Sequence, residues 1–148
     1  MYISSAADST NRRDTTMVER ATIEMWIAEY LRCWREKDAD DVAELFTENA
    51  VYRASPFREP YVGRAAIRDY WRRATGPQIG IYFEAGVPVC DENRASVEWW
   101  ATWTADEKPK TLPGCLILRF ATDGKCEELR EYWHSEKTIL ALPQGWGY

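Results

Sequence analysis

Three residues near the end of the chain carry the side chains best suited to chemistry. The segment 125–135, KCEELREYWHS, reads as a β-strand, and alternation along a strand places Arg130, Tyr132 and His134 on one side. His134 is the only histidine in the chain. An imidazole with an ordinary pKa of about 6.5 suits proton transfer near neutrality. We therefore predict that His134 exchanges a proton with a substrate, while Arg130 and Tyr132 orient a carbonyl or carboxylate group.

The other side of the same strand carries Leu129, Glu131 and Trp133. If that side faces the interior, His134 is a residue at the strand end that solvent or a neighbouring carboxylate satisfies. Alternation alone leaves both arrangements open.

Tyr30 and Tyr52 are secondary candidates, because a phenol can donate a hydrogen bond to an oxyanion inside an apolar cavity. In the alternative interpretation, Tyr30 only continues the apolar stripe of the first helix. The chain of 148 residues also contains eight Trp, eight Tyr and four Phe. Flat aromatic side chains of this kind line cores and ligand cavities, so we expect a small apolar ligand or substrate.

Charge and composition exclude several classes of function. The net charge of -5 gives no basic surface for nucleic acid. No apolar run is long enough to span a membrane, and the polar N-terminus has no hydrophobic signal core, so we expect a cytoplasmic protein. With one histidine and four scattered cysteines, the sequence predicts no metal site and no cofactor.

The spacing of apolar residues predicts the order of the elements. A three-and-four repeat indicates a long helix between Val18 and Lys37, and Asp38 begins a second, shorter helix. A third helix follows Gly63 and stops at Gly76. Residues 1–16 lack periodicity and are predicted to form a disordered tail before a single domain over 17–148. The expected strands are a short one at 50–54 and four long ones at 79–90, 94–105, 110–121 and 125–135.

Helices followed by antiparallel strands indicate an α+β domain. The element order, together with YLRCWREKDADDVAELF at 30–46 and AVYRASPFREPYVGRAAIRDYW at 50–71, resembles the nuclear transport factor 2-like superfamily. This superfamily includes the ketosteroid isomerases and the SnoaL-like polyketide cyclases. The resemblance implies three N-terminal helices packed on a curved, mainly antiparallel sheet, a cystatin-like α+β barrel with a central pocket. It also implies a homodimer through the outer sheet face, where Trp100 lies among polar residues.

The resemblance assigns functional residues only in part. Tyr30 falls on the tyrosine with which ketosteroid isomerases hydrogen-bond the developing oxyanion. Their general-base aspartate would fall at Ala54 or Ser55, and their second aspartate would fall near Leu116. None of these three side chains is a carboxylate. Steroid isomerisation by that mechanism is therefore not expected.

The resemblance also aligns Arg130, Tyr132 and His134 with inward-facing positions of the last strand, which favours the first of its two sides. The predicted catalytic residues are then His134, Tyr30 and Arg130. The residues predicted to bind the substrate are Tyr52, Trp71, Trp99, Trp103, Leu116, Leu118 and Tyr132.

Two main functions follow from this set. The first is a cofactor-independent isomerase, cyclase, dehydratase or hydrolase that acts on a small apolar carbonyl, polyketide or terpenoid compound. The second is a domain that binds a hydrophobic ligand without catalysis, which the missing aspartates favour. A domain that binds other proteins through its open sheet face is a weaker third, because the sequence shows no basic or peptide-binding edge.

Overall fold

The computed structural model describes residues 17–148, so the predicted tail at 1–16 lies outside the described residues. Three helices come early in the chain: α1 (Arg20–Glu36), α2 (Ala39–Glu44) and α3 (Arg64–Thr75). Helix α1 ends where Lys37 takes a left-handed conformation with φ 56°. Asp38 then caps α2 by accepting a hydrogen bond of 2.9 Å from the backbone N–H of Asp41. All three helices lie where the sequence predicted them.

A mixed, mainly antiparallel sheet of seven strands completes the α+β fold. Its strand order is β2-β1-β7-β6-β5-β3. Strand β4 pairs with the beginning of β5, which does not pair with β3. Among the described strands, β1 and β7 form the parallel pair. Within residues 17–148, no pairing joins β2 to β3 and closes the sheet. The strands are β1 (Phe46–Arg53), β2 (Tyr61–Val62), β3 (Gln78–Ala85), β4 (Val89–Asp91), β5 (Arg94–Ala105), β6 (Lys108–Phe120) and β7 (Cys126–Trp133).

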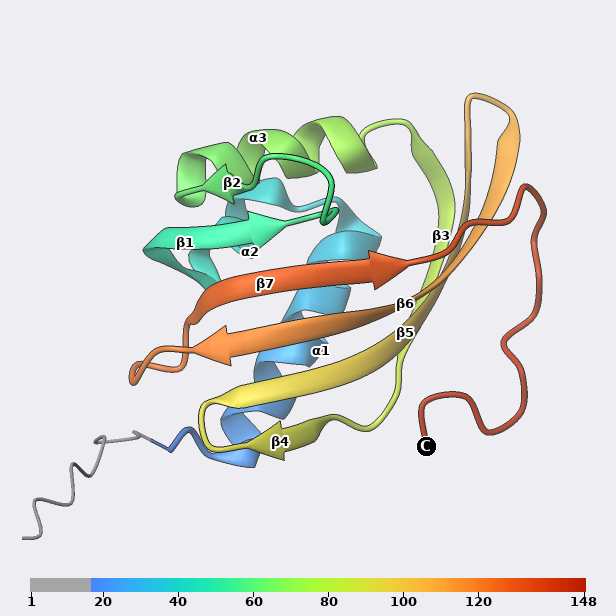
Figure 1. Ribbon diagram of the computed structural model, residues 1–148. Helices are drawn as coiled ribbons and strands as arrows, with labels where there is room; N and C mark the ends of the chain where they lie inside the picture. The colour runs from blue at the N-terminus through green and yellow to red at the C-terminus, as the bar shows by residue number, and fades with distance from the viewer. Residues whose placement is uncertain (1–16) are drawn as a thin grey trace, which may run out of the picture.

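The strand predicted at 79–90 is two strands in the structure. Gly86 and Pro88, which the sequence marked as the site of a bend, lie in the break between β3 and β4. A second irregularity lies within β3, where the register against β5 shifts near Gly80, a residue with φ 65°. These interruptions let the sheet curve around the helices (Figure 1).

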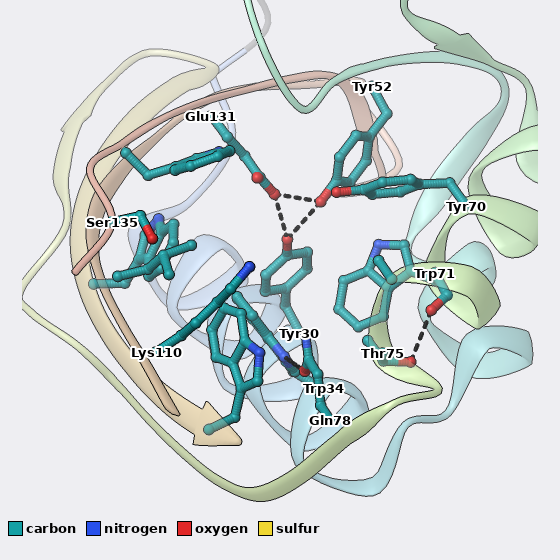
Figure 2. A pocket seen from close by; sticks show the side chains of 15 residues that line it. Tyr30, Trp34, Tyr52, Tyr70, Trp71, Thr75, Gln78, Lys110, Glu131 and Ser135 are labelled. Carbon is teal, nitrogen blue, oxygen red and sulfur yellow. Dashed lines mark hydrogen bonds between the residues drawn. The ribbon is translucent and has the colours of Figure 1, made fainter. Parts of the chain in front are cut away.

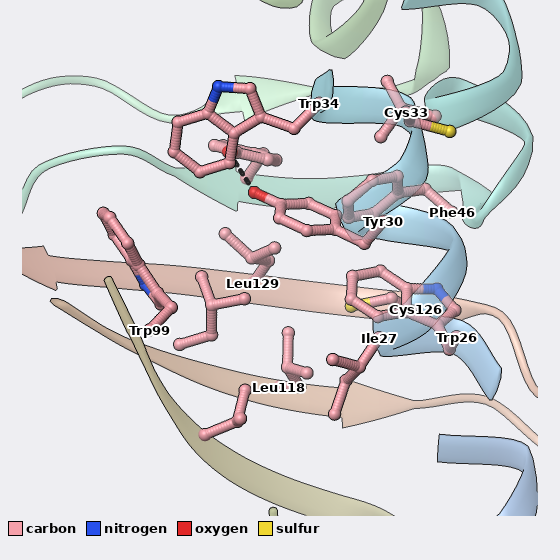
Figure 3. Close-up of a cluster of buried hydrophobic side chains, with 14 of the residues drawn as sticks. Trp26, Ile27, Tyr30, Cys33, Trp34, Phe46, Trp99, Leu118, Cys126 and Leu129 are labelled. Carbon is pink, nitrogen blue, oxygen red and sulfur yellow. Dashed lines mark hydrogen bonds between the residues drawn. The ribbon is translucent and has the colours of Figure 1, made fainter. Parts of the chain in front are cut away.

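The core lies between α1 and the sheet. Trp26 and Tyr30 of α1 stack with ring centroids 5.1 Å apart, and Trp34, one turn further on, lies 5.5 Å from the ring of Trp99 in β5. Figure 3 shows these aromatic rings together with Leu118 and other aliphatic side chains from the strands. In Figure 1, α1 crosses behind the sheet, whereas α3 lies beside β1 and β2, which it contacts.

The chain returns over the sheet after β7. Trp100 donates a hydrogen bond of 3.2 Å to the backbone oxygen of Leu140, and its ring meets Trp146 edge-on. Gly86 and Gly147 pack so closely that a Cβ on Gly86 would lie 2.4 Å from the backbone oxygen of Gly147. The sequence predicted that a partner subunit covers the sheet face around Trp100. In the structure the chain's own C-terminal segment covers Trp100. The homodimer itself stays a prediction.

The helices between residues 17 and 148 are too short or too polar to cross a membrane.

Candidate active site

A cavity of about 220 Å³ lies between α1, α3 and the sheet. This volume is below the range of roughly 300–1,000 Å³ for pockets that hold drug-sized ligands, so it suits a small compound. Among its lining residues, Lys110, Trp133 and Ser135 are exposed and mark the side that meets solvent. Eight aromatic side chains form most of the wall: Tyr30, Trp34, Tyr52, Tyr70, Trp71, Trp99, Trp103 and Trp133. The remaining lining residues are Ala74, Thr75, Gln78, Lys110, Leu112, Glu131 and Ser135.

The carboxyl group of Glu131 is held by two phenols inside this cavity. Tyr52 donates a short hydrogen bond to Oε1 of Glu131, and the hydroxyl of Tyr30 donates a second of 3.2 Å to the same oxygen. The two hydroxyl oxygens are 3.0 Å from each other, which completes the triangle drawn in Figure 2. No hydrogen bond from the described residues reaches Oε2 of Glu131. That oxygen is available to a ligand.

Burial shifts the acidity of Glu131 toward neutrality. The residue is only 7% exposed, and the loss of solvation raises the pKa of its carboxyl to about 7. The hydrogen bonds from Tyr52 and Tyr30 favour the carboxylate and oppose this rise without cancelling it. Near neutral pH the group therefore exists in both protonation states, which is the condition for a general acid or base.

The tyrosines around Glu131 have raised pKa values. Burial, together with the nearby carboxyl of Glu131, raises the pKa of Tyr30 and of Tyr52 well above the ordinary value for a phenol. Burial also raises the pKa of Tyr70, whose ring lies 5.3 Å from that of Tyr52. All three phenols thus keep their protons at neutral pH.

The pairing of the strands explains why Glu131 faces inward. Glu131 lies opposite Leu116 of β6, and Leu116 lies opposite Val97 of β5. Paired residues share a face of the sheet, and both aliphatic partners are buried. On the neighbouring strand, Tyr52 of β1 pairs with Leu129, two residues before Glu131. The same face therefore carries Tyr52, Leu129 and Glu131, and Tyr30 reaches them from the buried stripe of α1.

The sequence pattern of the SnoaL-like domain matches residues 27–129. The chain belongs to the SnoaL-like family. The matched stretch of this SnoaL-like protein includes Tyr30 and Tyr52 but ends two residues before Glu131.

Two solved structures share the fold of this chain. One is SalBIII, described as an epoxide hydrolase/cyclase-like enzyme with a role in pyran ring formation in the polyether salinomycin. It superimposes with a TM-score of 0.70 at 23% identity, over 78% of this chain and 93% of that one. Another is a hypothetical protein with a ketosteroid isomerase-like fold from Catenulispora acidiphila, in complex with trimethylamine. Its TM-score is 0.66 at 13% identity, over 72% of this chain and 83% of that one. No curated protein matched the sequence significantly.

The inward orientation predicted for Arg130, Tyr132 and His134 is wrong. All three are exposed in the SnoaL-like domain. Arg130 donates a hydrogen bond of 2.8 Å to Glu128. His134 does not line the cavity but a second, more open hollow, together with Phe57 and Tyr132. The resemblance placed them on the inner face, whereas the buried partners of β7 require the opposite orientation. The predicted roles in catalysis and binding depended on that placement.

The other predicted residues divide between cavity and core. Tyr52, Trp71, Trp99 and Trp103 line the cavity, and their part in binding a substrate stays a prediction. Tyr30 lines it too, and its predicted catalytic role also stays a prediction. Leu116 and Leu118 are buried in the core and do not line the cavity.

Sequence reasoning missed Glu131 and Tyr70. The signal for Glu131 was present in the strand itself. Glu131 shares its side of β7 with Leu129 and Trp133, and apolar residues at every second position mark the side of a strand that faces the core. A carboxyl group does lie beside Leu116, because Glu131 of β7 is directly opposite Leu116 of β6. Between residues 17 and 148, no three His, Cys, Asp or Glu side chains gather closely enough to hold a metal ion.

Proposed function

We propose that this SnoaL-like domain is a cofactor-independent enzyme that uses the carboxyl group of Glu131 for general acid–base catalysis on a small, largely apolar oxygenated compound. The observation that carries the proposal is a single buried carboxyl with a pKa of about 7 in an aromatic cavity. Its oxygen Oε2 has no partner among the described residues. Active sites commonly hold a group poised in this way.

The geometry favours Glu131 as a general acid in the first step. The protonated carboxyl donates its proton from Oε2 to an oxygen of the substrate, which weakens the C–O bond of an epoxide or polarises a carbonyl. The carboxylate that remains is stabilised at Oε1 by Tyr30 and Tyr52, whose hydrogen bonds strengthen as the negative charge develops. The proton lost by the attacking hydroxyl group or water restores the carboxyl.

The class of reaction is a ring closure, hydrolysis, isomerisation or dehydration in which a proton moves to or from oxygen. Ring closure or hydrolysis of an epoxide is the first choice within this class, because SalBIII, which shares the fold, is described as epoxide hydrolase/cyclase-like. Eight aromatic side chains around the cavity favour an apolar carbon skeleton of polyketide or terpenoid type.

The alternative is a non-catalytic domain that binds a hydrophobic ligand. The aromatic wall favours this function as much as it favours an enzyme, so only the carboxyl of Glu131 distinguishes the two.

Turnover of the purified protein against small epoxides, hydroxy-epoxides and cyclic ketones, followed by mass spectrometry, tests the proposal. For any compound that is converted, Glu131→Gln is expected to lower kcat by roughly 100-fold or more, because general acid–base catalysis contributes about 10²–10⁴-fold. KM should change only a few-fold. Activity of the natural chain should fall as the pH rises above about 7, where Glu131 loses its proton. Full turnover in Glu131→Gln contradicts the proposal, and binding without conversion across the panel supports the alternative.

A further inference from the structure

The indole N–H of Trp71 is a buried donor with no acceptor. Trp71 is 3% exposed, its side chain lines the cavity, and within residues 17–148 its Nε1 has no hydrogen-bond partner. Buried donors in folded proteins are satisfied in nearly every case, because an unpaired one forfeits its hydrogen bonds to water. An unpaired donor on a cavity wall therefore indicates that a bound ligand supplies the hydrogen-bond acceptor.

Four other tryptophans between residues 17 and 148 have an acceptor supplied by the fold, whereas the buried Nε1 atoms of Trp99 and Trp146 are unpaired like that of Trp71. Trp34, on the same wall, donates to Oε1 of Gln78 at 2.8 Å, and Trp26 donates to the backbone oxygen of Leu45 at 2.8 Å. At the exposed side of the cavity, Trp133 donates to the backbone oxygen of Ala54 at 3.1 Å. Of the three unpaired indole donors among the described residues, Trp146 lies outside the cavity, and Trp71 and Trp99 belong to residues that line it.

Trp99 is also unpaired and buried, but its donor faces a different surface. A Cβ on Gly114 would lie 2.6 Å from Cε2 of Trp99, the ring carbon bonded to Nε1. The nitrogen edge of Trp99 therefore packs along the backbone of β6. By contrast, Trp71 stands on α3 beside Tyr30 and Tyr70, with its nitrogen on the side of the tyrosine hydroxyls (Figure 2).

We propose that the cavity binds a compound with at least two oxygen functions, one of which accepts a hydrogen bond from Nε1–H of Trp71. The other oxygen meets Oε2 of Glu131, and this half of the assignment rests on the function proposed above. The bound oxygen at Trp71 is that of a neutral carbonyl, ether or hydroxyl group. The buried part of the lining carries no cation, so an anionic oxygen there would be buried without a counter-charge.

Binding of three ring compounds tests this assignment without relying on turnover. Cyclohexane-1,4-dione carries two acceptor oxygens, cyclohexanone carries one, and methylcyclohexane carries none. The dione is expected to shift the indole N–H resonance of Trp71 in the natural chain, as followed by ¹⁵N-resolved NMR with independent assignment of that signal. In Trp71→Phe, which keeps an aromatic ring but removes the donor, the Kd of the dione should rise roughly 3- to 10-fold. The Kd of methylcyclohexane should stay within about twofold.

Trp100→Phe is the matched control, because it removes an indole donor that bonds to Leu140 outside the cavity. It should leave all three affinities unchanged. Equal loss of dione and methylcyclohexane affinity in Trp71→Phe, an unmoved Trp71 resonance in the natural chain, or no binding of either ketone overturns the assignment. The NMR arm needs no variant, so it decides the matter even if Trp71→Phe does not fold. If the ketones do bind through Trp71 while Glu131→Gln keeps full turnover, the assignment of an oxygen to Trp71 stands and the proposed function fails.

Discussion

Two glutamates three residues apart in β7 have carboxyl pKa values that are shifted in opposite directions. Glu128 accepts hydrogen bonds from Arg130 and Arg119 at the surface, and the bond from Arg130 lowers the pKa of its carboxyl below the ordinary range. Glu131 faces the cavity, where burial raises the pKa to about 7. One strand therefore presents a permanently charged carboxylate on one side and a proton-exchanging carboxyl on the other. The comparison shows that orientation, more than residue type, decides which side chain can perform acid–base chemistry.

The largest expected effect separates these two glutamates in catalysis. Glu131→Gln should lower kcat on any identified substrate by roughly 10²–10⁴-fold, because it removes the exchangeable proton. Glu128→Gln, which changes the same residue type on the outer face, should stay within about threefold. Steady-state kinetics of both variants measures the contrast. Equal losses would show that the inner placement of Glu131 does not matter.

Stability against pH provides the second contrast. The carboxyl of Glu131 titrates near 4.5 in the unfolded chain and near 7 in the fold, so between these values only the folded state keeps the proton. Stability is therefore lost as the pH rises through this window. Glu131→Gln has no such titration. Between pH 4.5 and 8 the natural chain should therefore lose about 3 kcal/mol more unfolding free energy than the variant. Urea unfolding at several pH values measures this difference, and a constant difference would be incompatible with a raised pKa.

The tyrosine contacts should tune Glu131 by a smaller amount. Tyr52→Phe removes a hydrogen bond that favours the carboxylate, so the pKa of Glu131 should rise further, by about one to two units. Tyr132→Phe removes a hydroxyl from the outer face of β7 and should leave that pKa unchanged. The pH dependence of activity or of the stability difference reports both values. A downward shift in Tyr52→Phe would reverse the assigned role of the phenol.

The outer-face residues should have the smallest effects. His134→Ala and Arg130→Ala should keep kcat within about threefold, because neither side chain lines the cavity. Each should change the unfolding free energy by no more than about 1 kcal/mol, as is typical of exposed groups and surface ion pairs. Kinetics and urea unfolding check both expectations. A 100-fold loss of turnover in His134→Ala would return the catalytic role to the histidine.

The sequence predicted the fold well because the fold depends on patterns that extend over many residues. The apolar repeat of α1 and the alternation in β5, which puts Trp99 and Trp103 on the cavity side, each involve several side chains. A single unexpected residue does not disturb such a pattern. The break at Gly86 and Pro88 was also visible, because these residues interrupt strands for local reasons.

The site was harder to predict because it depends on the orientation of one strand. If the strand is shifted by one residue, each side chain of β7 moves to the other face. Arg130 and His134 then face inward in place of Glu131. A buried carboxyl is also unusual without partners, and its partners Tyr30 and Tyr52 lie 101 and 79 residues away in the chain. Only the folded domain, in which α1 packs on the sheet, brings the three groups together.

The protonation of Glu131 is the most direct measurement of the central claim. Carboxyl ¹³C NMR of the glutamate-labelled protein, with the signal of Glu131 identified by its absence from Glu131→Gln, follows this one group through its titration. We predict a midpoint near pH 7. A midpoint at or below the ordinary value of about 4.5 would contradict the account, because the cavity would then hold a permanent carboxylate with no proton to donate at neutral pH.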